Sequence, residues 1–380
     1  MFKLLKNAEC YAPEYLGRRD ILVAFDKIVQ ILPTISKEHL PHLEIIECEG
    51  KIACPGFIDQ HVHLSGGGGE QGPQSSIMPI GVEALTSAGV TTAVGLLGAD
   101  AVGKSMQGLL MKARSLEDDG LTTYIYSGHY GVPPATITGR VLTDIALIDK
   151  IIGTGEIAIS DYRSSYPSQQ ELVKLAHEAL TGGMLGRKAG VMHLHVGEGK
   201  EGLGPLLDLL ESTDFPVSMF VPTHINRSST LFRQAVQYWT NEGNIDLTAG
   251  ENTVVGCGVA DCLQQLINSG NGLERVTVSS DGNGSGAGES HNEVGRVMAL
   301  FNDIRTAIHD YKMPLETVLK TVTSNVAKVL KLYPVKGHLA SGSDADILIL
   351  DRNKFTLYML FARGHLLFEN GKPIAKQASG

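Results

Sequence analysis

The sequence lacks a long apolar run, an excess of positive charge and a signal-like start. No hydrophobic stretch reaches the roughly 18 residues that a transmembrane helix needs, so we expect no membrane partner. The first residues, MFKLLKNAECYAPEYLG, bring charge and proline too early for a secretory signal peptide. Basic residues number 32 against 41 acidic ones, giving a net charge of −9 without a basic run, which argues against a nucleic-acid partner.

Cysteine is also scarce, and its number and spacing indicate the redox state of the compartment. The five cysteines are scattered and odd in number, which disfavours a disulfide scaffold and favours a reducing cytoplasm. They are Cys10, Cys48, Cys54, Cys257 and Cys262. The last two have the spacing of half a zinc site, but the sequence offers no second half, so ordinary buried thiols are the favoured interpretation.

What the chain does have is apolar residues and glycine. Hydrophobic residues make up 43% and charged residues 19%, enough for a large core and unlike a disordered chain. The 380 residues suit a barrel of roughly 250 residues with a smaller module. The 44 glycines gather at 66–69, 182–183 and 282–288, where we expect tight loops close to a ligand.

Short apolar segments alternate with helical patterns along most of the chain. The strand-like segments are 56–64, 89–97, 122–128, 156–161, 191–196, 216–224, 244–249 and 275–281. Helical patterns fill 103–118, 205–212, 229–240, 259–268 and 291–310, and another begins at Ser168 as N-cap and stops at Gly182-Gly183. Eight apolar strands alternating with helices favour an α/β fold of the (β/α)8 TIM-barrel class, with a doubly wound open sheet as the rival.

The two ends of the chain have a different pattern from the middle. Residues 1–54 contain alternating segments such as DILVAFDKIVQIL without a barrel helix, and residues 338–380 contain ADILILD, FTLYMLFARG and HLLFENGKPI. Neither end is long enough for a sheet domain of its own. We therefore expect both ends to pair into one small β-sandwich module beside a catalytic barrel at residues 55–337.

Metal-ligand residue types stand at five of the eight expected strand ends. His61 and His63 are two apart on one strand and so share a face. The other strand ends carry Glu156, the pair His193 and His195, His224, and Asp281. Each residue alone is more often structural, but the carboxyl ends of barrel strands meet at one mouth. Together these donors predict a site for zinc or a similar divalent ion.

These residues resemble a known superfamily. The segment PGFIDQHVHL (55–64), the isolated His195 and His224, and Asp281 are similar to the amidohydrolase superfamily. Narrower motifs resemble its isoaspartyl (β-aspartyl) dipeptidase family, and the resemblance covers nearly the whole chain. They are GGGGEQGP (66–73), SDYRSS (160–165), PTHINR (222–227) and SSDGNGS (279–285).

The resemblance implies a pair of zinc ions per subunit. It implies His61 and His63 on one zinc with Asp281 near it, and His195 and His224 on the other. His195 is preferred to His193 because Val196-Gly197-Glu198 follows it, which leaves His193 packed or supporting a ligand. Known members bridge the metals with a carboxylated lysine, whereas this chain has Glu156 at the matching position. The carboxylate of Glu156, like the carbamate of a carboxylated lysine, is a monoanion with two metal-binding oxygens. We therefore expect Glu156 and a hydroxide to bridge two zinc ions, with a mononuclear site as the alternative.

The resemblance also implies an activity, the zinc-dependent hydrolysis of isoaspartyl dipeptides by metal-bound hydroxide. Asp281 would transfer the proton and Tyr130 would donate to the oxyanion. Glu70 would pair with the substrate ammonium, and Arg163 and Arg227 with its carboxylates. Ser285 and the backbone at Gly68 and Gly69 would complete the pocket, as would Ala99, where the family commonly has threonine.

Two other functions remain open from the sequence. The first is another amidohydrolase, acting on cyclic amides or N-acyl groups like a dihydroorotase, a hydantoinase or a deacetylase. Such an enzyme would not need Glu70, Arg163 and Arg227. The second is an inactive barrel that serves as a structural or regulatory partner, which the intact metal-ligand set disfavours. The resemblance further implies a homo-oligomer.

Overall fold

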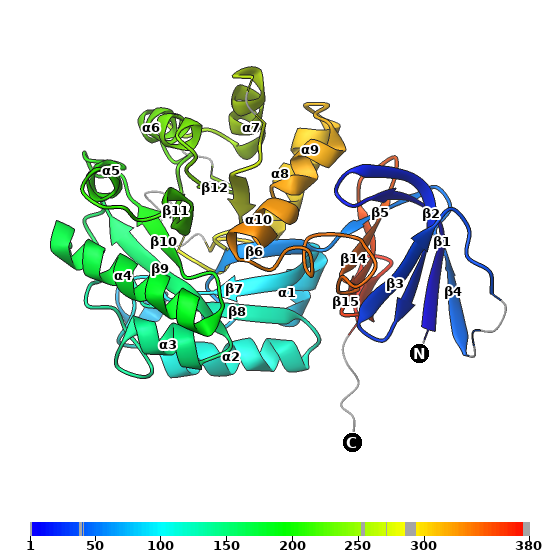
Figure 1. The fold of residues 1–380 in the computed structure, drawn as a ribbon, viewed down its shortest axis with the longest axis horizontal. Coiled ribbons are helices and arrows are strands. Elements are labelled where there is room, and N and C mark those ends of the chain that lie inside the picture. The colour runs from blue at the N-terminus through cyan, green and yellow to red at the C-terminus, as the bar shows by residue number, and fades with distance from the viewer. Residues whose placement is uncertain are drawn as a thin grey trace.

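The fold consists of a barrel with a sheet beside it (Figure 1). A computed structural model describes residues 2–37, 40, 42–251, 255–270, 272–285 and 294–374. The barrel strands are β6 (Phe57–Val62), β7 (Val90–Gly95), β8 (Thr122–Ser127), β9 (Ile151–Ile159), β10 (Val191–Val196), β11 (Phe220–Thr223), β12 (Ile245–Thr248) and β13 (Val276–Ser279).

These parallel strands follow one another around a closed ring. Strands β6 to β11 pair in chain order, and β12 pairs with β13. Strand β12 also contacts β11 and β13 contacts β6, while a parallel bridge joins Val62 to Gly282. The expected (β/α)8 barrel is therefore present, and the open-sheet alternative is wrong.

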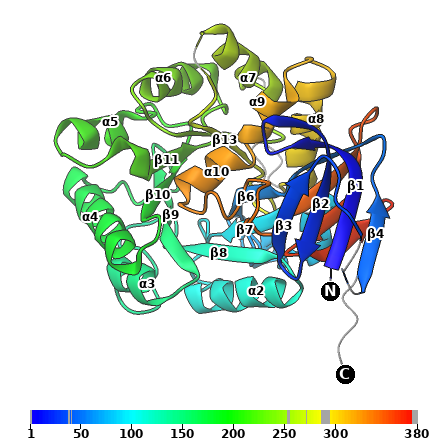
Figure 2. The ribbon, with the colours of Figure 1, turned by 45° about the vertical axis from the view of Figure 1, so that its right-hand side comes forward.

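A helix follows each barrel strand and covers the ring from outside (Figure 2). The helices are α1 (Val82–Ser87), α2 (Met106–Asp118), α3 (Val141–Leu147), α4 (Gln169–Gly186), α5 (Gly204–Glu211), α6 (Ser229–Thr240), α7 (Val259–Asn268), α8 (Met298–His309), α9 (Leu315–Lys320) and α10 (Ser324–Val329), with short 3-10 turns at Pro73–Ser75 and Val217–Met219. Within the described ranges, no helix is long and apolar enough to cross a membrane.

Burial explains why the barrel strands are apolar without alternation. Every residue of β9 is buried, because side chains on one face fill the barrel and those on the other pack under the helices. Helix α6 shows the complementary pattern, with a buried stripe that includes Leu231, Ala235 and Tyr238. Ser168 caps α4 as expected, in a reciprocal capping box with Glu171.

The expected stop of α4 at Gly182-Gly183 is wrong. The helix continues to Gly186 and ends at Arg187, which adopts the left-handed conformation. A Cβ at Gly182 would lie 2.8 Å from the carbonyl oxygen of Leu142, and one at Gly183 would lie 2.6 Å from the Cα of Gly190. The glycine pair thus allows α4 to pack tightly against its neighbours and does not end it.

Three other boundaries differ from the sequence expectation. Strand β9 begins at Ile151, before the expected segment 156–161, so Glu156 lies inside the strand. The segment 216–224 begins with the 3-10 turn at Val217–Met219, so β11 starts only at Phe220. Helix α8 starts at Met298, later than the pattern at 291–310 indicates. Positions 291–293 of that pattern, and 286–288 of the third glycine cluster, fall outside the described residues.

Strands from both ends of the chain share the second sheet. They are β1 (Phe2–Tyr11), β2 (Tyr15–Ala24), β3 (Lys27–Leu32), β4 (Leu43–Glu47) and β5 (Lys51–Pro55) from the first part, and β14 (Ile347–Asp351), β15 (Leu357–Ala362), β16 (His365–Glu369) and β17 (Lys372–Pro373) from the last. Strands β5 and β14 join the two sets by antiparallel pairing. Along β14, Ile347 and Ile349 pack into the sheet's own core, while Leu348 and Leu350 join the barrel's core. The sheet is thereby anchored to the barrel.

Candidate active site

An irregularity in β9 positions Glu156 at the barrel mouth. Between the pairs Met192 with Thr154 and Leu194 with Ile157, strand β9 contains one residue more than β10. Gly155 makes this possible, because a Cβ there would lie 2.8 Å from the Cβ of His193. A bulge of this kind redirects a side chain. Here the redirected side chain is the fully buried carboxylate of Glu156.

Four histidines and one aspartate surround this carboxylate. His195 Nδ1 and His224 Nε2 lie 2.7 Å and 3.0 Å from Glu156 Oε1. On the other side, His61 Nε2 and His63 Nε2 lie 3.3 Å and 3.8 Å from Glu156 Oε2. Asp281 Oδ1 lies 3.3 Å from His61 Nε2 and 3.1 Å from His63 Nε2. One oxygen of Glu156 thus faces each pair of histidines.

The donor set fits a pair of metal ions. Two groups with metal-binding geometry share Glu156, one with His61 and His63 and one with His195 and His224. Among the described residues, His61 Nε2, Glu156 Oε2 and Asp281 Oδ1 are buried and have no hydrogen-bond partner. Buried polar atoms without partners are costly, and a cation among them would satisfy all three.

Other side chains fix the orientation of the histidine rings. His224 Nδ1 lies 2.8 Å from the Thr248 hydroxyl, which leaves Nε2 facing Glu156. His195 Nε2 lies 2.9 Å from Asp161 Oδ2, which leaves Nδ1 facing Glu156. A hydrogen bond to the far nitrogen sets the tautomer and direction of a metal-binding imidazole. Both rings therefore present a nitrogen to the same carboxylate oxygen.

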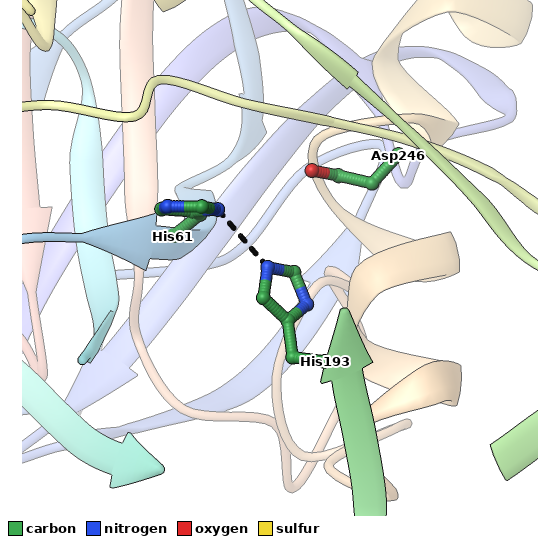
Figure 3. A group of neighbouring side chains, drawn as sticks. All are labelled: His61, His193 and Asp246. Carbon is green, nitrogen blue, oxygen red and sulfur yellow. Dashed lines mark hydrogen bonds between the residues drawn. The ribbon is translucent and has the colours of Figure 1, made fainter. Parts of the chain in front are cut away.

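A third group beneath the site is a support and not a metal site of its own. His193 Nε2 lies 3.0 Å from His61 Nδ1, and Asp246 lies close to both rings (Figure 3). The Asp246 carboxylate already accepts hydrogen bonds from Gln60, Thr223, Thr277 and Ser279. Four donors saturate a carboxylate, so His193 and Asp246 brace the floor of the barrel mouth.

Charge and burial set the protonation states in the cluster. Burial opposes ionisation of Glu156, but the charges of His61 and His195 hold its pKa well below the usual range. Burial, and then the nearby Arg227 charge, lower the pKa of His224 to about 3, so its imidazole is neutral at pH 7. Burial raises the pKa of Tyr130 well above its ordinary value, which keeps its hydroxyl protonated. Burial opposes protonation of His61, but the charges of Glu156 and Asp281 raise its pKa well above the usual value, so a bound cation would take the place of its proton.

Three of the expected substrate residues form a connected group next to the metal donors. The Ser285 hydroxyl donates to Glu70 Oε1 at 2.9 Å, and Arg163 Nη1 lies 3.7 Å from the same oxygen. The Arg163 guanidinium packs over the Tyr130 ring at 5.2 Å. The Tyr130 hydroxyl in turn lies 3.0 Å from His195 Nδ1. Serine, glutamate and arginine thus approach the metal donors through Tyr130.

The remaining expected residues lie in the neighbouring loops. Arg227 is buried three positions after His224, with Nε 3.7 Å from Glu251 Oε2. Gly68 and Gly69 have φ of 76° and 96°. A Cβ at Gly68 would also lie 2.2 Å from the Ser75 carbonyl oxygen, so packing within the loop already requires glycine there. Ala99 follows Gly98, whose absent Cβ would lie 2.9 Å from His63 Cε1.

Sequence reasoning missed several residues that shape the site. Asp161 stands in the SDYRSS motif but was given no role, and Thr248 had no motif to mark it. Gly284 stands in the SSDGNGS motif and in a glycine cluster, but it too was given no role of its own. A Cβ at this position would lie 2.4 Å from Asp281 Oδ1 and 2.8 Å from His63 Cδ2, so glycine there makes room for the ligands. The available signal was closeness in sequence to an assigned residue, Arg163 for Asp161 and Ser285 for Gly284.

Comparisons with known proteins show what this chain is similar to. A family model described as the amidohydrolase family matches residues 223–370. The dihydroorotase of Staphylococcus aureus (strain MRSA252) is 28% identical over 160 residues, 42% of this chain, and the match spans 35% of that relative's length. The dihydropyrimidinase of Brevibacillus agri NCHU1002 shares 15% identity at a TM-score of 0.69, covering 99% of this chain and 96% of that one, and shows the fold alone.

Another solved structure matches throughout at higher identity. The β-aspartyl dipeptidase of Fervidobacterium islandicum AW-1 is 39% identical, with a TM-score of 0.93 and 100% of both chains covered. Its structure in complex with the β-Asp-Leu dipeptide gives 39% identity, a TM-score of 0.92 and the same coverage. The chain therefore belongs to the β-aspartyl dipeptidase family of the amidohydrolase superfamily, a family of peptide hydrolases.

Proposed function

We propose that this protein hydrolyses isoaspartyl dipeptides with the help of two divalent metal ions, zinc by preference. The observation that carries the proposal is the contact between two halves of the site, the metal-donor half and the substrate half. Arg163 Nη2 lies 3.3 Å from His195 Nε2, while Nη1 of the same guanidinium lies 3.7 Å from Glu70. Residues suited to a charged dipeptide therefore adjoin residues suited to a metal pair. The relative solved with β-Asp-Leu supports the choice of substrate.

Six side chains would hold the metal ions. His61, His63 and Asp281 would bind one, His195 and His224 would bind the other, and Glu156 would lie between them. When bound, two such ions polarise the scissile carbonyl and lower the pKa of water toward neutrality. The partnerless atoms of His61, Glu156 and Asp281 are the support for this assignment among the described residues.

Asp281 and Tyr130 are suited to the proton and charge transfers. The Asp281 side chain is 18% exposed, whereas that of Glu156 is fully buried, so Asp281 can reach both water and substrate. In our proposal Asp281 accepts a proton from the attacking water and gives it to the amine as the amide C–N bond breaks. The protonated Tyr130 hydroxyl donates to the oxygen on which negative charge develops.

The substrate's own charges match the rest of the pocket. A β-aspartyl dipeptide carries an α-ammonium group and two carboxylates. Glu70 would accept hydrogen bonds from the ammonium, alongside the Ser285 hydroxyl. Arg163 and Arg227 would bind the carboxylates, because a guanidinium binds them through paired hydrogen bonds. A neutral cyclic amide would leave these charged groups unpaired.

A substrate comparison with purified, zinc-loaded protein tests the proposal. We expect hydrolysis of β-aspartyl-leucine to exceed that of α-aspartyl-leucine, dihydroorotate and an N-acetylated amino sugar by a large factor. Preferred turnover of dihydroorotate would instead indicate a cyclic-amide hydrolase. Metal analysis distinguishes the enzyme from an inactive barrel. About two zinc ions per chain are expected for the enzyme, and none for the inactive barrel.

A further inference from the structure

Asp161 is the one carboxylate that contacts both halves of the proposed site within the described part of the chain. It lies two residues after the end of β9 and is buried. Its Oδ2 accepts from His195 Nε2 at 2.9 Å and from Arg163 Nη2 at 2.8 Å. Its Oδ1 accepts from the Arg163 backbone N at 2.7 Å and from Arg163 Nε at 3.0 Å. Four N–H groups thus saturate this carboxylate.

The loop after β10 is built around this side chain. A Cβ at Gly197 would lie 2.5 Å from the Asp161 Cβ, and one at Gly199 would lie 2.4 Å from the Ser160 carbonyl oxygen. The Ser160 hydroxyl also donates to the Gly202 carbonyl at 2.8 Å. Glycines therefore let the two loops close over Asp161 and hold it in place.

The hydrogen bonds of Asp161 determine what its two neighbours can do. Because a carboxylate only accepts, His195 must donate from Nε2, and its Nδ1 lone pair is left for the Glu156 side, where a metal would bind. The same carboxylate accepts hydrogen bonds from Nε and Nη2 of Arg163. The remaining nitrogen, Nη1, therefore faces Glu70 and the proposed substrate position.

We propose that Asp161 is a positioning residue that couples metal binding to dipeptide binding, by orienting His195 and Arg163 with one carboxylate. The inference rests on the proposed function, since it presumes that His195 binds metal and Arg163 binds substrate. Because one carboxylate contacts both side chains, loss of Asp161 weakens metal binding and dipeptide binding together.

The experiment compares D161N with T248V in the full-length protein. Thr248 orients His224 as Asp161 orients His195, but within the described part of the chain its hydroxyl bonds only to His224, which makes it the matched control. Zinc affinity is measured by competition with a chelator, without substrate. KM and kcat for β-aspartyl-leucine are measured separately at saturating zinc. Thermal unfolding of the metal-free proteins checks the fold, and D161A replaces D161N if the amide prevents folding.

We expect D161N to lower zinc affinity about 10- to 100-fold, the usual effect of removing a hydrogen bond to a metal-binding histidine. We also expect its KM to rise about tenfold even with zinc saturated, because Arg163 loses its anchor. T248V should lower zinc affinity and leave KM unchanged.

An active wild type whose D161N variant keeps its KM, its zinc affinity or both would overturn the inference and leave the proposed function intact. A T248V variant whose KM rises as much as that of D161N would also overturn it. A wild type that binds zinc but leaves the dipeptide intact would contradict the proposed function and, with it, the substrate half of the coupling.

Discussion

Asp281 differs from the other proposed ligands in its access to solvent. Burial opposes its ionisation, but the charge of His61 and the close approach of the His61 and His63 rings hold its pKa well below the usual range. It is therefore a carboxylate at neutral pH, able to accept a proton from water. It lies two residues after β13 and approaches His61 Nε2, the atom that also faces Glu156 Oε2.

D281N should remove most turnover and leave zinc bound. The amide has nearly the same shape but cannot accept and return a proton, so kcat should fall at least about 100-fold. The other five donors retain the metal, which elemental analysis checks. D310N is the matched control, because the Asp310 side chain is exposed and pairs with the neighbouring His309. Unchanged turnover in D281N would refute the proton-transfer role.

Replacing either arginine with methionine should mainly raise KM. R163M and R227M keep an unbranched apolar stem but lose the guanidinium that binds a carboxylate, so KM for β-aspartyl-leucine should rise about 10- to 100-fold. Each change also leaves an acid, Asp161 or Glu251, without its arginine, so unfolding is measured in parallel. The exposed Arg233 gives the control R233M. Unaltered KM in both variants would mean that the arginines do not bind substrate.

At the scale of elements, glycine decides where neighbouring segments come close. Gly155 permits the irregularity that turns Glu156 into the mouth, and Gly182 permits the contact between α3 and α4. Both glycines lie inside a regular element, where glycine is ordinarily a weak choice. Glycine is needed at both positions because a neighbouring element approaches too closely for a Cβ.

G182A should destabilise the protein although alanine favours helices. The propensity gain is about 1 kcal/mol, but the added methyl would lie 2.8 Å from a backbone oxygen that cannot easily move. Overpacking costs about 1–3 kcal/mol, so we expect a net loss of stability, seen as a lower midpoint of thermal unfolding. G204A in α5 is the control, since its Cβ would lie 3.6 Å from the nearest atom and should be neutral or mildly stabilising. A stabilised G182A would show that α3 and α4 can separate at little cost.

At the scale of the whole molecule, the metal pair would join strands from opposite sides of the ring. The proposed donors come from β6, β9, β10, β11 and the segment after β13. A ligand that binds only the folded state raises stability, so chelation should lower the unfolding midpoint and zinc should restore it.

Reconstitution with zinc should not depend on bicarbonate. Glu156 supplies a permanent carboxylate at the position where a carboxylated lysine would need carbon dioxide. Metal-free protein should regain equal activity in buffers with and without added bicarbonate. A clear bicarbonate requirement would contradict the bridging role of Glu156 and indicate a lysine in its place.

The sequence by itself determined the alternation of strands and helices and the donors at strand ends, because backbone periodicity and strand-end position are local properties. His61, His195, His224 and Asp281 could be chosen from those properties and from the resemblance. Only the tertiary structure decided that Asp161 reaches His195 across 34 positions, or that Thr248 reaches His224 across 24. Such contacts depend on how loops from different strands face one another. The extra residue in β9 changes which of its side chains point into the barrel mouth, and no local sequence pattern predicts it.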